Sequence, residues 1–252
     1  MIFSKTAVLS VALLALVSFY SCKKYDHPGH MPKAGIALTF DDDYIDDWYK
    51  YLIFFDTSNV KVTFYISNYL KLTADQINKL HILKDHGHEI GYHSVTHPDF
   101  VKYLQNNSMG KLEHEEIIKG LERMNKDGFS PVTFAYPFGS HNEVLDNCML
   151  RRFKSIRFLN GTTNYAKSFT TSNDNYELYA MGMDMSSGKS NQELVNFVKQ
   201  AKENDNCLVL VGHHIGRKDL EMQVPFMRLK AIVKAAKDLG MEFYTASEIS
   251  RK

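Results

Sequence analysis

The sequence predicts an α/β protein folded as a closed or nearly closed barrel of seven or eight parallel strands. Short apolar runs alternate along the chain with stretches in which apolar residues recur at three- and four-residue spacing. Strands that are apolar throughout and are each followed by a helix are typical of a parallel sheet covered on its outer face. Seven or eight such units within about 220 residues favour a closed or nearly closed barrel.

The predicted elements follow one another in regular order. Strands are predicted at 34–40, 61–66, 88–92, 132–136, 154–159, 177–183, 207–212 and 241–245. Helices are predicted at 45–56, 74–86, 111–127, 142–152, 190–204 and 225–238. In the last of these helices, Phe226, Leu229, Ile232, Val233 and Ala236 share one face, which is the pattern of a helix that packs against a sheet.

Length and composition bound the classes of protein that remain. The chain has 252 residues, of which 44% are hydrophobic and 23% are charged, and this suits one domain of the larger kind. The formal net charge is +1, without a long run of one sign. Recognition of nucleic acid through a basic face is therefore unsupported, and we expect no nucleic-acid partner.

The first residues have the pattern of an export signal. Lys5 precedes an uncharged apolar run over residues 7–20, which is too short to span a membrane comfortably but suits a signal peptide. The run ends at Ser21-Cys22, which resembles a bacterial lipoprotein signal. We therefore expect a signal peptide at 1–21, a lipidated Cys22, a polar tether at 22–33 and the folded domain at 34–252.

This pattern also predicts the location of the protein. We expect an exported bacterial lipoprotein of the periplasm, outer membrane or cell surface, which is held to the membrane only through its lipid anchor. A secreted protein without lipid is the alternative. Cys148 and Cys207 remain after processing, and the sequence leaves open whether they form a disulfide.

Two short segments far apart in the chain indicate a metal site. Asp41 and Asp42 directly follow the first predicted strand, and His93 follows the third, with His97 four residues further on. Because the carboxyl ends of barrel strands converge on one mouth, we expect these side chains to meet. One carboxylate and two imidazoles can hold zinc while leaving positions open for water and substrate. The other carboxylate is then available as a base.

Two further motifs lie at the same end of their strands. Pro137-Phe138-Gly139 follows the fourth predicted strand, and His213-His214 closes the seventh. The pKa of an ordinary imidazole lies near neutrality, so a histidine at this exit is well placed to protonate a leaving group. We select His213 for this role. The alternative is a core histidine that donates to a backbone carbonyl.

Together these motifs resemble the polysaccharide deacetylase family, which is the NodB-homology group or carbohydrate esterase family 4. The matching segments are TFDD at 39–42, HSVTH at 93–97, the Pro-Phe-Gly turn at 137–139 and the apolar strand that ends in His213. They occur in order across about 34–248. The resemblance implies a distorted (β/α) barrel of the NodB-homology type and a metal-dependent hydrolase that removes acetyl groups from an N-acetylated sugar in a polysaccharide or glycan.

The resemblance also implies roles for single residues. Asp41 corresponds to the base, Asp42, His93 and His97 to the metal ligands, and His213 to the acid. Phe138 lies where a backbone N–H helps to hold the oxyanion, and its neighbours Tyr136 and Gly139 are candidates for oxyanion or substrate contacts. Zinc is the expected divalent metal, although cobalt, manganese or nickel would suit the same ligands.

The chain departs from the family pattern in one respect that bears on the base. The family often has an arginine two residues before the proline of the third motif, and here that position is Ala135. We expect Arg157, on the next strand, to project into the same site and orient the base. Two alternative functions remain open, an O-acetyl esterase of the xylan type and a non-catalytic carbohydrate-binding lipoprotein.

Overall fold

The computed structural model describes residues 33–160, 165–170, 176–216 and 221–250. The expected signal peptide, Cys22 and all of the tether except Lys33 lie outside these residues. Within the described part of the chain, no helix is long and apolar enough to cross a membrane.

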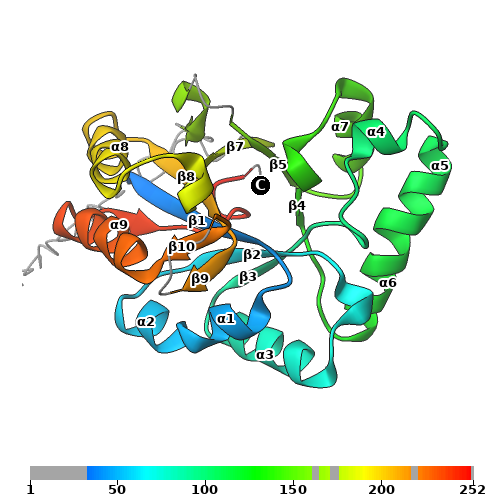
Figure 1. Ribbon diagram of the computed structural model, residues 1–252, viewed down its shortest axis with the longest axis horizontal. Coiled ribbons are helices and arrows are strands. Elements are labelled where there is room, and N and C mark those ends of the chain that lie inside the picture. The colour runs from blue at the N-terminus through cyan, green and yellow to red at the C-terminus, as the bar shows by residue number, and fades with distance from the viewer. Residues whose placement is uncertain (1–32, 161–164, 171–175, 217–220, 251–252) are drawn as a thin grey trace, which may run out of the picture.

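Seven parallel strands close into a barrel, which confirms the predicted fold class (Figure 1). In order around the ring they are β1 (Gly35–Asp42), β2 (Val62–Ile66), β3 (Glu89–Tyr92), β4 (Thr133–Ala135), β5 (Ser155–Leu159), β7 (Glu177–Gly182) and β8 (Cys207–Gly212). The ring closes because β8 pairs in parallel with β1, from Gly35 opposite Cys207 to Phe40 opposite Gly212.

Four shorter strands lie outside this ring. The last predicted strand is β11 (Glu242–Phe243), which pairs in parallel with the start of β1. β6 (Phe169–Thr170) pairs antiparallel with β8, and β9 (His214–Gly216) forms a separate sheet with β10 (Gln223–Pro225). The sequence did not predict β6, β9 and β10, because these short strands do not lie within longer apolar runs.

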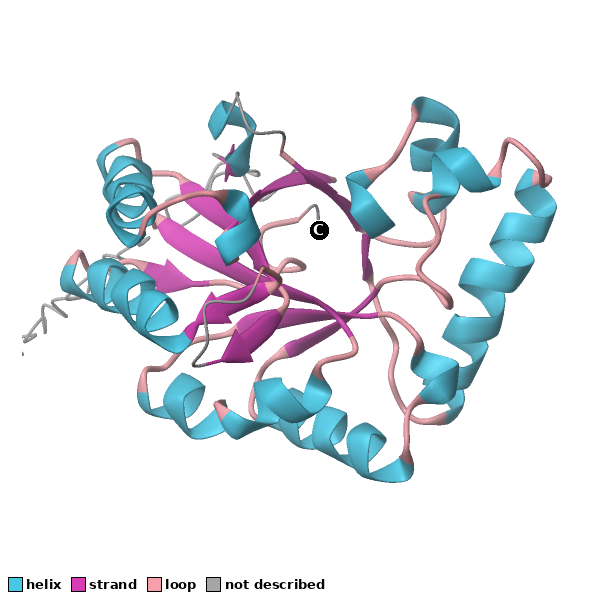
Figure 2. Ribbon diagram, in the orientation of Figure 1, coloured by secondary structure: helices cyan, strands magenta, loops and turns pink. Residues whose placement is uncertain are grey.

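Helices cover the outside of the barrel (Figure 2). They are α1 (Ile45–Lys50), α2 (Leu52–Thr57), α3 (Ala74–Asp85), α4 (Phe100–Tyr103), α5 (Met109–Leu112), α6 (Lys119–Lys126), α7 (Glu143–Met149), α8 (Asn191–Glu203) and α9 (Phe226–Asp238). Short 3-10 turns are η1 (Tyr69–Lys71), η3 (Pro137–Gly139), η4 (Tyr165–Ser168) and η5 (Met185–Ser187), and a π-helical segment, η2 (Glu113–Ile118), joins α5 to α6.

The helices agree with the prediction apart from two details. The predicted helix 45–56 is divided at Tyr51 into α1 and α2, and α4 was not predicted. The face predicted for α9 is confirmed at Leu229, Ile232, Val233 and Ala236, which are buried.

Two apolar layers hold the fold together. The larger one lies between the sheet and the helices and includes Trp48, Phe64 and Phe134. The smaller one includes short side chains such as those of Ala37 and Ala135, which leave room for the large side chains that point into the barrel. Because the strands are apolar on both faces, they read in the sequence as continuous apolar runs.

The last described residues lie near the amino ends of the strands. The Ala246 amide donates to Thr63 Oγ1 at 2.8 Å, and Ser250 Oγ donates to Ser155 Oγ at 2.7 Å. Thr63 and Ser155 lie at the starts of β2 and β5. The C-terminal segment therefore covers the amino end of the barrel and leaves the carboxyl end to the polar motifs.

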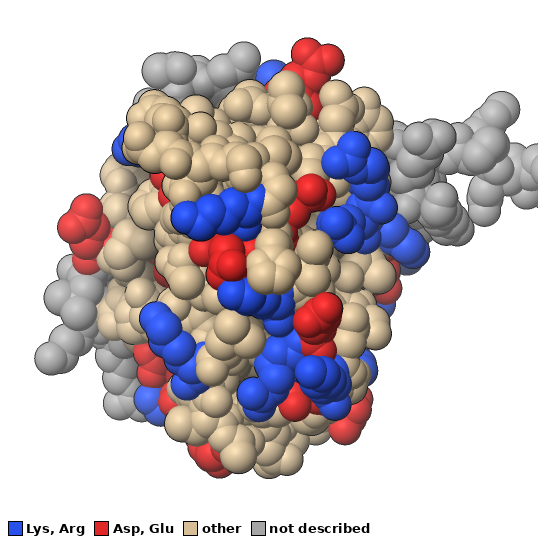
Figure 3. Space-filling view, turned by 90° about the vertical axis from the view of Figure 1, so that its right-hand side faces the viewer, with Lys and Arg blue, Asp and Glu red and all other residues tan. Residues whose placement is uncertain are grey.

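Cys148 and Cys207 are both buried and both free, so they do not bridge. On the face that carries α5 and α6, Lys and Arg side chains lie among Asp and Glu side chains (Figure 3). The pair Arg123 and Asp127, with Nε 2.8 Å from Oδ2, is an example. This face is mixed in sign.

Candidate active site

Polar residues gather at the carboxyl ends of four strands, as the sequence predicts. Asp41 and Asp42 end β1, and His93 directly follows β3. The turn η3 comes two residues after β4, and His213 directly follows β8. The parallel register of the barrel therefore brings residues from distant parts of the chain to one mouth.

Asp42, His93 and His97 place three ligand atoms around a common point. His97 Nε2 lies 3.4 Å from Asp42 Oδ1 and 3.1 Å from His93 Nε2, and the distance from His93 Nε2 to Asp42 Oδ1 is 3.8 Å. Two ligands that each lie about 2.0–2.1 Å from a tetrahedral zinc ion are separated by roughly 3.4 Å. The three side chains therefore fit a divalent metal.

The ring of His93 is held in the orientation that a metal ligand needs. Its Nδ1 lies 2.7 Å from the Ala135 carbonyl oxygen, so Nδ1–H donates to this oxygen and the Nε2 lone pair faces the other two ligands. Burial lowers the pKa of His93 to about 3. A neutral imidazole with a free lone pair is the form that binds metal.

Asp41 lies beside this triangle and is paired with a buried arginine. Asp41 Oδ2 accepts a hydrogen bond from Arg157 Nη2 and lies 3.7 Å from His93 Nε2. Burial raises the pKa of Asp41, but the positive charge of Arg157, its hydrogen bond to Asp41 and the charge of His213 more than offset this effect. The pKa of Asp41 therefore lies below its usual range, and the carboxylate can accept a proton at neutral pH.

Arg157 reaches Asp41 from the position that the sequence indicated. It pairs in register with Ala135 across β4 and β5, so its side chain enters the barrel at the same level. The guanidinium is completely buried and lies 5.2 Å from the centre of the Tyr65 ring, which is a cation–π contact.

Of the two adjacent histidines, His213 is the one that is hydrogen-bonded to the buried carboxylate of Asp184. Its Nδ1–H donates to Asp184 Oδ2 at 2.7 Å, and its backbone N–H donates to Asp184 Oδ1 at 3.1 Å. Burial lowers the pKa of His213, but its hydrogen bond to Asp184 and the charge of Asp41 outweigh this effect, so the pKa is raised. His214 instead pairs with Asp47 of α1, Nδ1 to Oδ2 at 2.8 Å, and its ring lies against Tyr44.

Asp184 is the residue that sequence reasoning missed. It follows β7 by two residues and is almost completely buried. Arg228 of α9 fixes this turn, because its Nη1 donates to the carbonyl oxygens of Met183 and Asp184 at 2.9 Å each. The sequence did hold a signal for Asp184, because this acidic residue comes just after a predicted strand. The other motifs were located by the same rule, that polar residues at the carboxyl ends of barrel strands meet at one mouth.

The turn η3 presents the backbone of Phe138 at the mouth. The Phe138 side chain is 62% exposed, and its ring centre lies 4.7 Å from that of His97. Tyr136 is fully buried, and its ring stacks on Phe158. The Gly139 amide donates to the Tyr136 carbonyl, and a Cβ on Gly139 would lie 2.7 Å from the Leu159 nitrogen. Tyr136 and Gly139 therefore support the turn, and a contact of either residue with the oxyanion or the substrate stays a prediction.

Backbone strain is concentrated at this mouth. Ser94, His97 and Phe138 have φ values of 68°, 57° and 59°, and Asp42 has 84°. Such values are uncommon for residues other than glycine, although asparagine, aspartate and histidine adopt them more often than the rest. Residues in this conformation persist where the surroundings hold them in place, and they cluster at functional sites.

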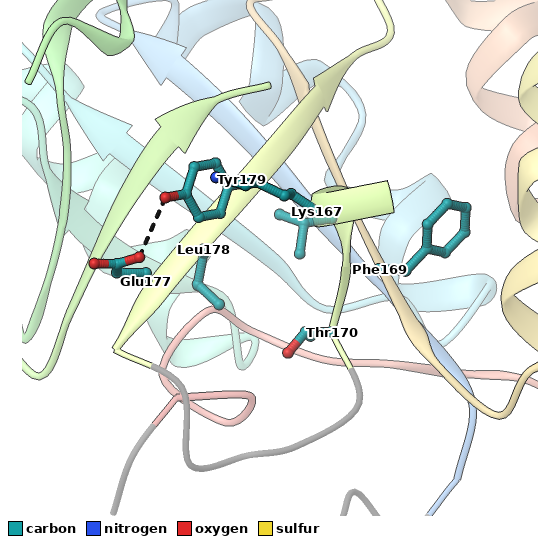
Figure 4. A pocket seen from close by; sticks show the side chains of 7 residues that line it. Lys167, Phe169, Thr170, Glu177, Leu178 and Tyr179 are labelled. Atoms are coloured by element: carbon teal, nitrogen blue, oxygen red, sulfur yellow. Dashed lines mark hydrogen bonds between the residues drawn. The ribbon is translucent and has the colours of Figure 1, made fainter. Parts of the chain in front are cut away.

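A separate cavity of about 270 Å³ lies at the other end of the barrel (Figure 4). It is lined by Lys167, Phe169, Thr170, Glu177, Leu178, Tyr179 and Val209. Glu177 and Leu178 begin β7, so the cavity is at the amino ends of the strands. The Tyr179 hydroxyl donates to Glu177 within it. This cavity is therefore distinct from the polar mouth.

Comparisons with known proteins agree with this geometry. Residues 29–151 match the family model described as Polysaccharide deacetylase. A peptidoglycan-N-acetylglucosamine deacetylase of Bacillus cereus is 32% identical over 126 residues, which make up 49% of this chain and 42% of that protein. The chain thus matches less than half the length of this curated relative.

Solved structures share the fold. The chitin deacetylase from the fungus Colletotrichum lindemuthianum superposes with a TM-score of 0.61 and 15% identity, over 89% of this chain and 90% of that chain. The catalytic domain of a peptidoglycan N-acetylglucosamine deacetylase from Eubacterium rectale gives a TM-score of 0.59 and 18% identity, over 90% and 94%. At these identities the likeness concerns the fold alone.

Proposed function

We propose that this chain, whose residues 29–151 match the polysaccharide deacetylase family model, is a metal-dependent hydrolase that removes acetyl groups from an N-acetylated sugar in a polysaccharide or glycan. One observation carries the proposal. The ligand triangle of Asp42, His93 and His97 lies beside the Asp41–Arg157 pair, on the side of the barrel where His213 emerges. These are the groups that metal-assisted amide hydrolysis requires.

The first step uses the base. A divalent metal held by Asp42, His93 and His97 would polarise the acetyl carbonyl and lower the pKa of water at the site. Asp41 takes the proton from the attacking water, since its lowered pKa keeps the carboxylate ionised. Arg157 holds Oδ2 of Asp41 in place, which leaves Oδ1 for the proton.

The second step uses the acid. As the C–N bond breaks, His213 gives a proton from Nε2 to the departing nitrogen, and the products are acetate and a free amino sugar. Asp184 holds the Nδ1–H and stabilises the protonated ring, and the raised pKa of His213 favours the protonated form near neutrality. The backbone N–H of Phe138 is proposed to donate to the oxyanion, and loss of such a donor typically costs about 3–4 kcal/mol in other hydrolases.

The substrate and location belong to the same proposal. The curated relative is a peptidoglycan-N-acetylglucosamine deacetylase, and this supports a polymer that contains N-acetylglucosamine. The N-terminal pattern that ends at Cys22 supports an exported lipoprotein. Zinc is the proposed metal, because two imidazoles and one carboxylate suit it.

Acetate release tests the function. The purified protein is assayed on chitooligosaccharide, peptidoglycan and acetylxylan, with and without a chelator. We expect chelator-sensitive release from an N-acetylated substrate. Release from acetylxylan alone would indicate an O-acetyl esterase, and no release from any of the three would favour a carbohydrate-binding protein. Asp41→Asn should abolish turnover and retain zinc, whereas loss of zinc would mean that Asp41 and Asp42 have exchanged roles.

The lipid anchor has its own test. Labelled palmitate should enter the wild-type protein expressed in a bacterial host, and the protein should fractionate with membranes. Cys22→Ala should remove both the label and the membrane association. Equal labelling of the two proteins would contradict lipidation at Cys22.

A further inference from the structure

We propose that Glu116 is a positioning residue that holds the 93–97 loop in the shape that presents His93 and His97 to one metal ion. This rests on the proposed function, because it concerns the same metal. Glu116 lies in η2, on the helix that packs outside the barrel, and its side chain is directed at the loop between the two histidines.

The contacts of Glu116 are specific to that loop. Glu116 is only 3% exposed. Its Oε2 accepts from the Val95 amide at 3.1 Å and from the Thr96 amide at 2.8 Å, and its Oε1 accepts from Thr96 Oγ1 at 2.7 Å. Val95 and Thr96 are two of the three residues between the ligands. One carboxylate therefore holds the centre of the loop through three donors.

The loop needs such a support because its own backbone is strained. Ser94 and His97 both have positive φ. Within the loop, the His97 amide donates to Ser94 Oγ at 3.0 Å. A strained segment keeps its shape only where the surroundings determine it. The side chain of His97 is partly exposed, so its position depends on the loop more than that of buried His93 does.

The helix that carries Glu116 is itself attached to the strand that precedes the loop. Tyr92 Oη donates to the Glu116 carbonyl at 2.8 Å and to the Ile117 carbonyl at 3.2 Å. These carbonyls lie in the widened π-helical turns, where the ordinary helical bonds are altered. A Cβ on Gly120 would lie 2.0 Å from Tyr92 Oη, so a glycine allows this close approach.

The two attachments fix Glu116 relative to the metal ligands. Tyr92 directly precedes His93, and Thr96 directly precedes His97. The helix thus contacts the chain just before each histidine. Metal sites are well ordered when groups outside the ligand set hold the ligands on rigid elements, and loss of such groups weakens metal binding.

Glu89 offers a matched control in the same barrel. It begins β3, the strand that leads to His93, and its carboxylate accepts from Thr63 Oγ1, Thr133 Oγ1 and the Ser247 amide at 2.9–3.1 Å. Like Glu116, it is a mostly enclosed carboxylate with three donors. It lies at the amino end of the barrel, away from the ligands.

The experiment compares Glu116→Gln with Glu89→Gln in the mature chain. Zinc affinity is measured by competition with a chromophoric chelator, and stability of the zinc-free protein is measured by urea unfolding. Glutamine places an N–H₂ donor among the N–H and O–H donors that bond to the carboxylate in the wild type. Both variants should therefore unfold at a lower urea concentration than the wild type. We expect Glu116→Gln to weaken zinc binding about 10–100-fold, and Glu89→Gln to leave it within about twofold of wild type. Thr96→Val removes the hydroxyl donor and should weaken zinc binding less than Glu116→Gln does. Thr96→Ser keeps the hydroxyl and should bind zinc as the wild type does.

The outcomes separate the two proposals. Unchanged zinc affinity in both Glu116→Gln and Thr96→Val would overturn the role of Glu116 and leave the deacetylase proposal standing. Equal weakening in Glu116→Gln and Glu89→Gln would also overturn it, because the effect would then follow stability alone. If Glu116→Gln does not fold, the Thr96→Val and Thr96→Ser pair decides the question. Failure of the wild-type protein to bind any divalent metal would overturn the proposed function itself.

Discussion

Replacing Arg157 with methionine should destabilise the protein and move the acid limb of its pH–rate profile to higher pH. The Arg157 side chain is completely buried, and the Asp41 side chain that it contacts is 4% exposed. Methionine has a comparable reach and fills much of the space, so the main change is the loss of the charge and its hydrogen bond.

The size of the effect follows from burial. Removing one partner of a buried ion pair typically costs about 3–5 kcal/mol, because the other charge stays buried without compensation. A domain with roughly 5–15 kcal/mol of stability can lose this and still fold. Loss of the Tyr65 contact adds to the cost, and it would be about 0.5–2 kcal/mol.

The direction with pH is set by Asp41. Its pKa in the folded protein lies below the ordinary value of 3.8, so ionisation of Asp41 contributes stability above that value, and this contribution is lost as pH falls through the folded pKa. Without Arg157 the pKa of Asp41 rises. The variant should therefore be most destabilised relative to wild type near neutral pH, and the difference should shrink in acid.

Two assays measure the loss of stability and the shift of the acid limb. Urea unfolding of the zinc-free proteins at pH 7 and at pH 4 gives the stability difference, and kcat/KM for acetate release against pH gives the acid limb. Arg157→Lys is the control, because lysine keeps a positive charge but lacks the planar guanidinium group. Its stability and its acid limb should lie between those of the wild type and of Arg157→Met. In an Asp41→Asn background, Arg157→Met should cost much less than in wild type.

A result that refutes the reasoning is easily recognised. An equal urea midpoint for Arg157→Met and wild type at pH 7, with the acid limb unmoved, would show that Arg157 does not hold Asp41. A cost that is equal with Asp41 and with Asn at position 41 would show that Arg157 acts through packing only.

Three further predictions concern other parts of the site. Asp184→Asn should move the alkaline limb of kcat/KM to lower pH, because the raised pKa of His213 depends on Asp184; an unmoved limb would exclude His213 as the acid. His97→Ala should lower zinc content after dialysis while the fold is retained by circular dichroism, and full retention of zinc would argue against His97 as a ligand. Gly120→Ala should cost about 1–3 kcal/mol in urea unfolding, since its Cβ would meet Tyr92, and no loss would mean that the helix shifts freely.

The barrel was predictable because each of its strands can be recognised from its own residues alone. Each of the eight predicted strands is found, and each is an apolar run bounded by turn-forming residues. The break at Tyr51 between α1 and α2 was not predictable in this way, because the helical period continues through it. Strand β6 gave no signal, since its two residues pair antiparallel with β8 only once the barrel exists.

The sequence by itself determined which polar residues leave which strand. Parallel strands end at one mouth, so Asp41, Asp42, His93 and His213 could be placed together without coordinates. The spacing of the two histidines was also local information. These inferences needed only the order of elements along the chain.

Only the tertiary structure decided how those residues are partnered. Asp184 meets His213 across 29 positions, and Glu116 reaches the 93–97 loop from a neighbouring helix. Arg157 was expected to reach the base from the sequence, and the structure adds which atoms meet, Nη2 of Arg157 and Oδ2 of Asp41. The direction of a side chain depends on the register and tilt of its strand and on what packs beside it. Charge pairs of this kind form inside the barrel because burial makes an unpartnered charge costly, and that condition exists only in the folded chain.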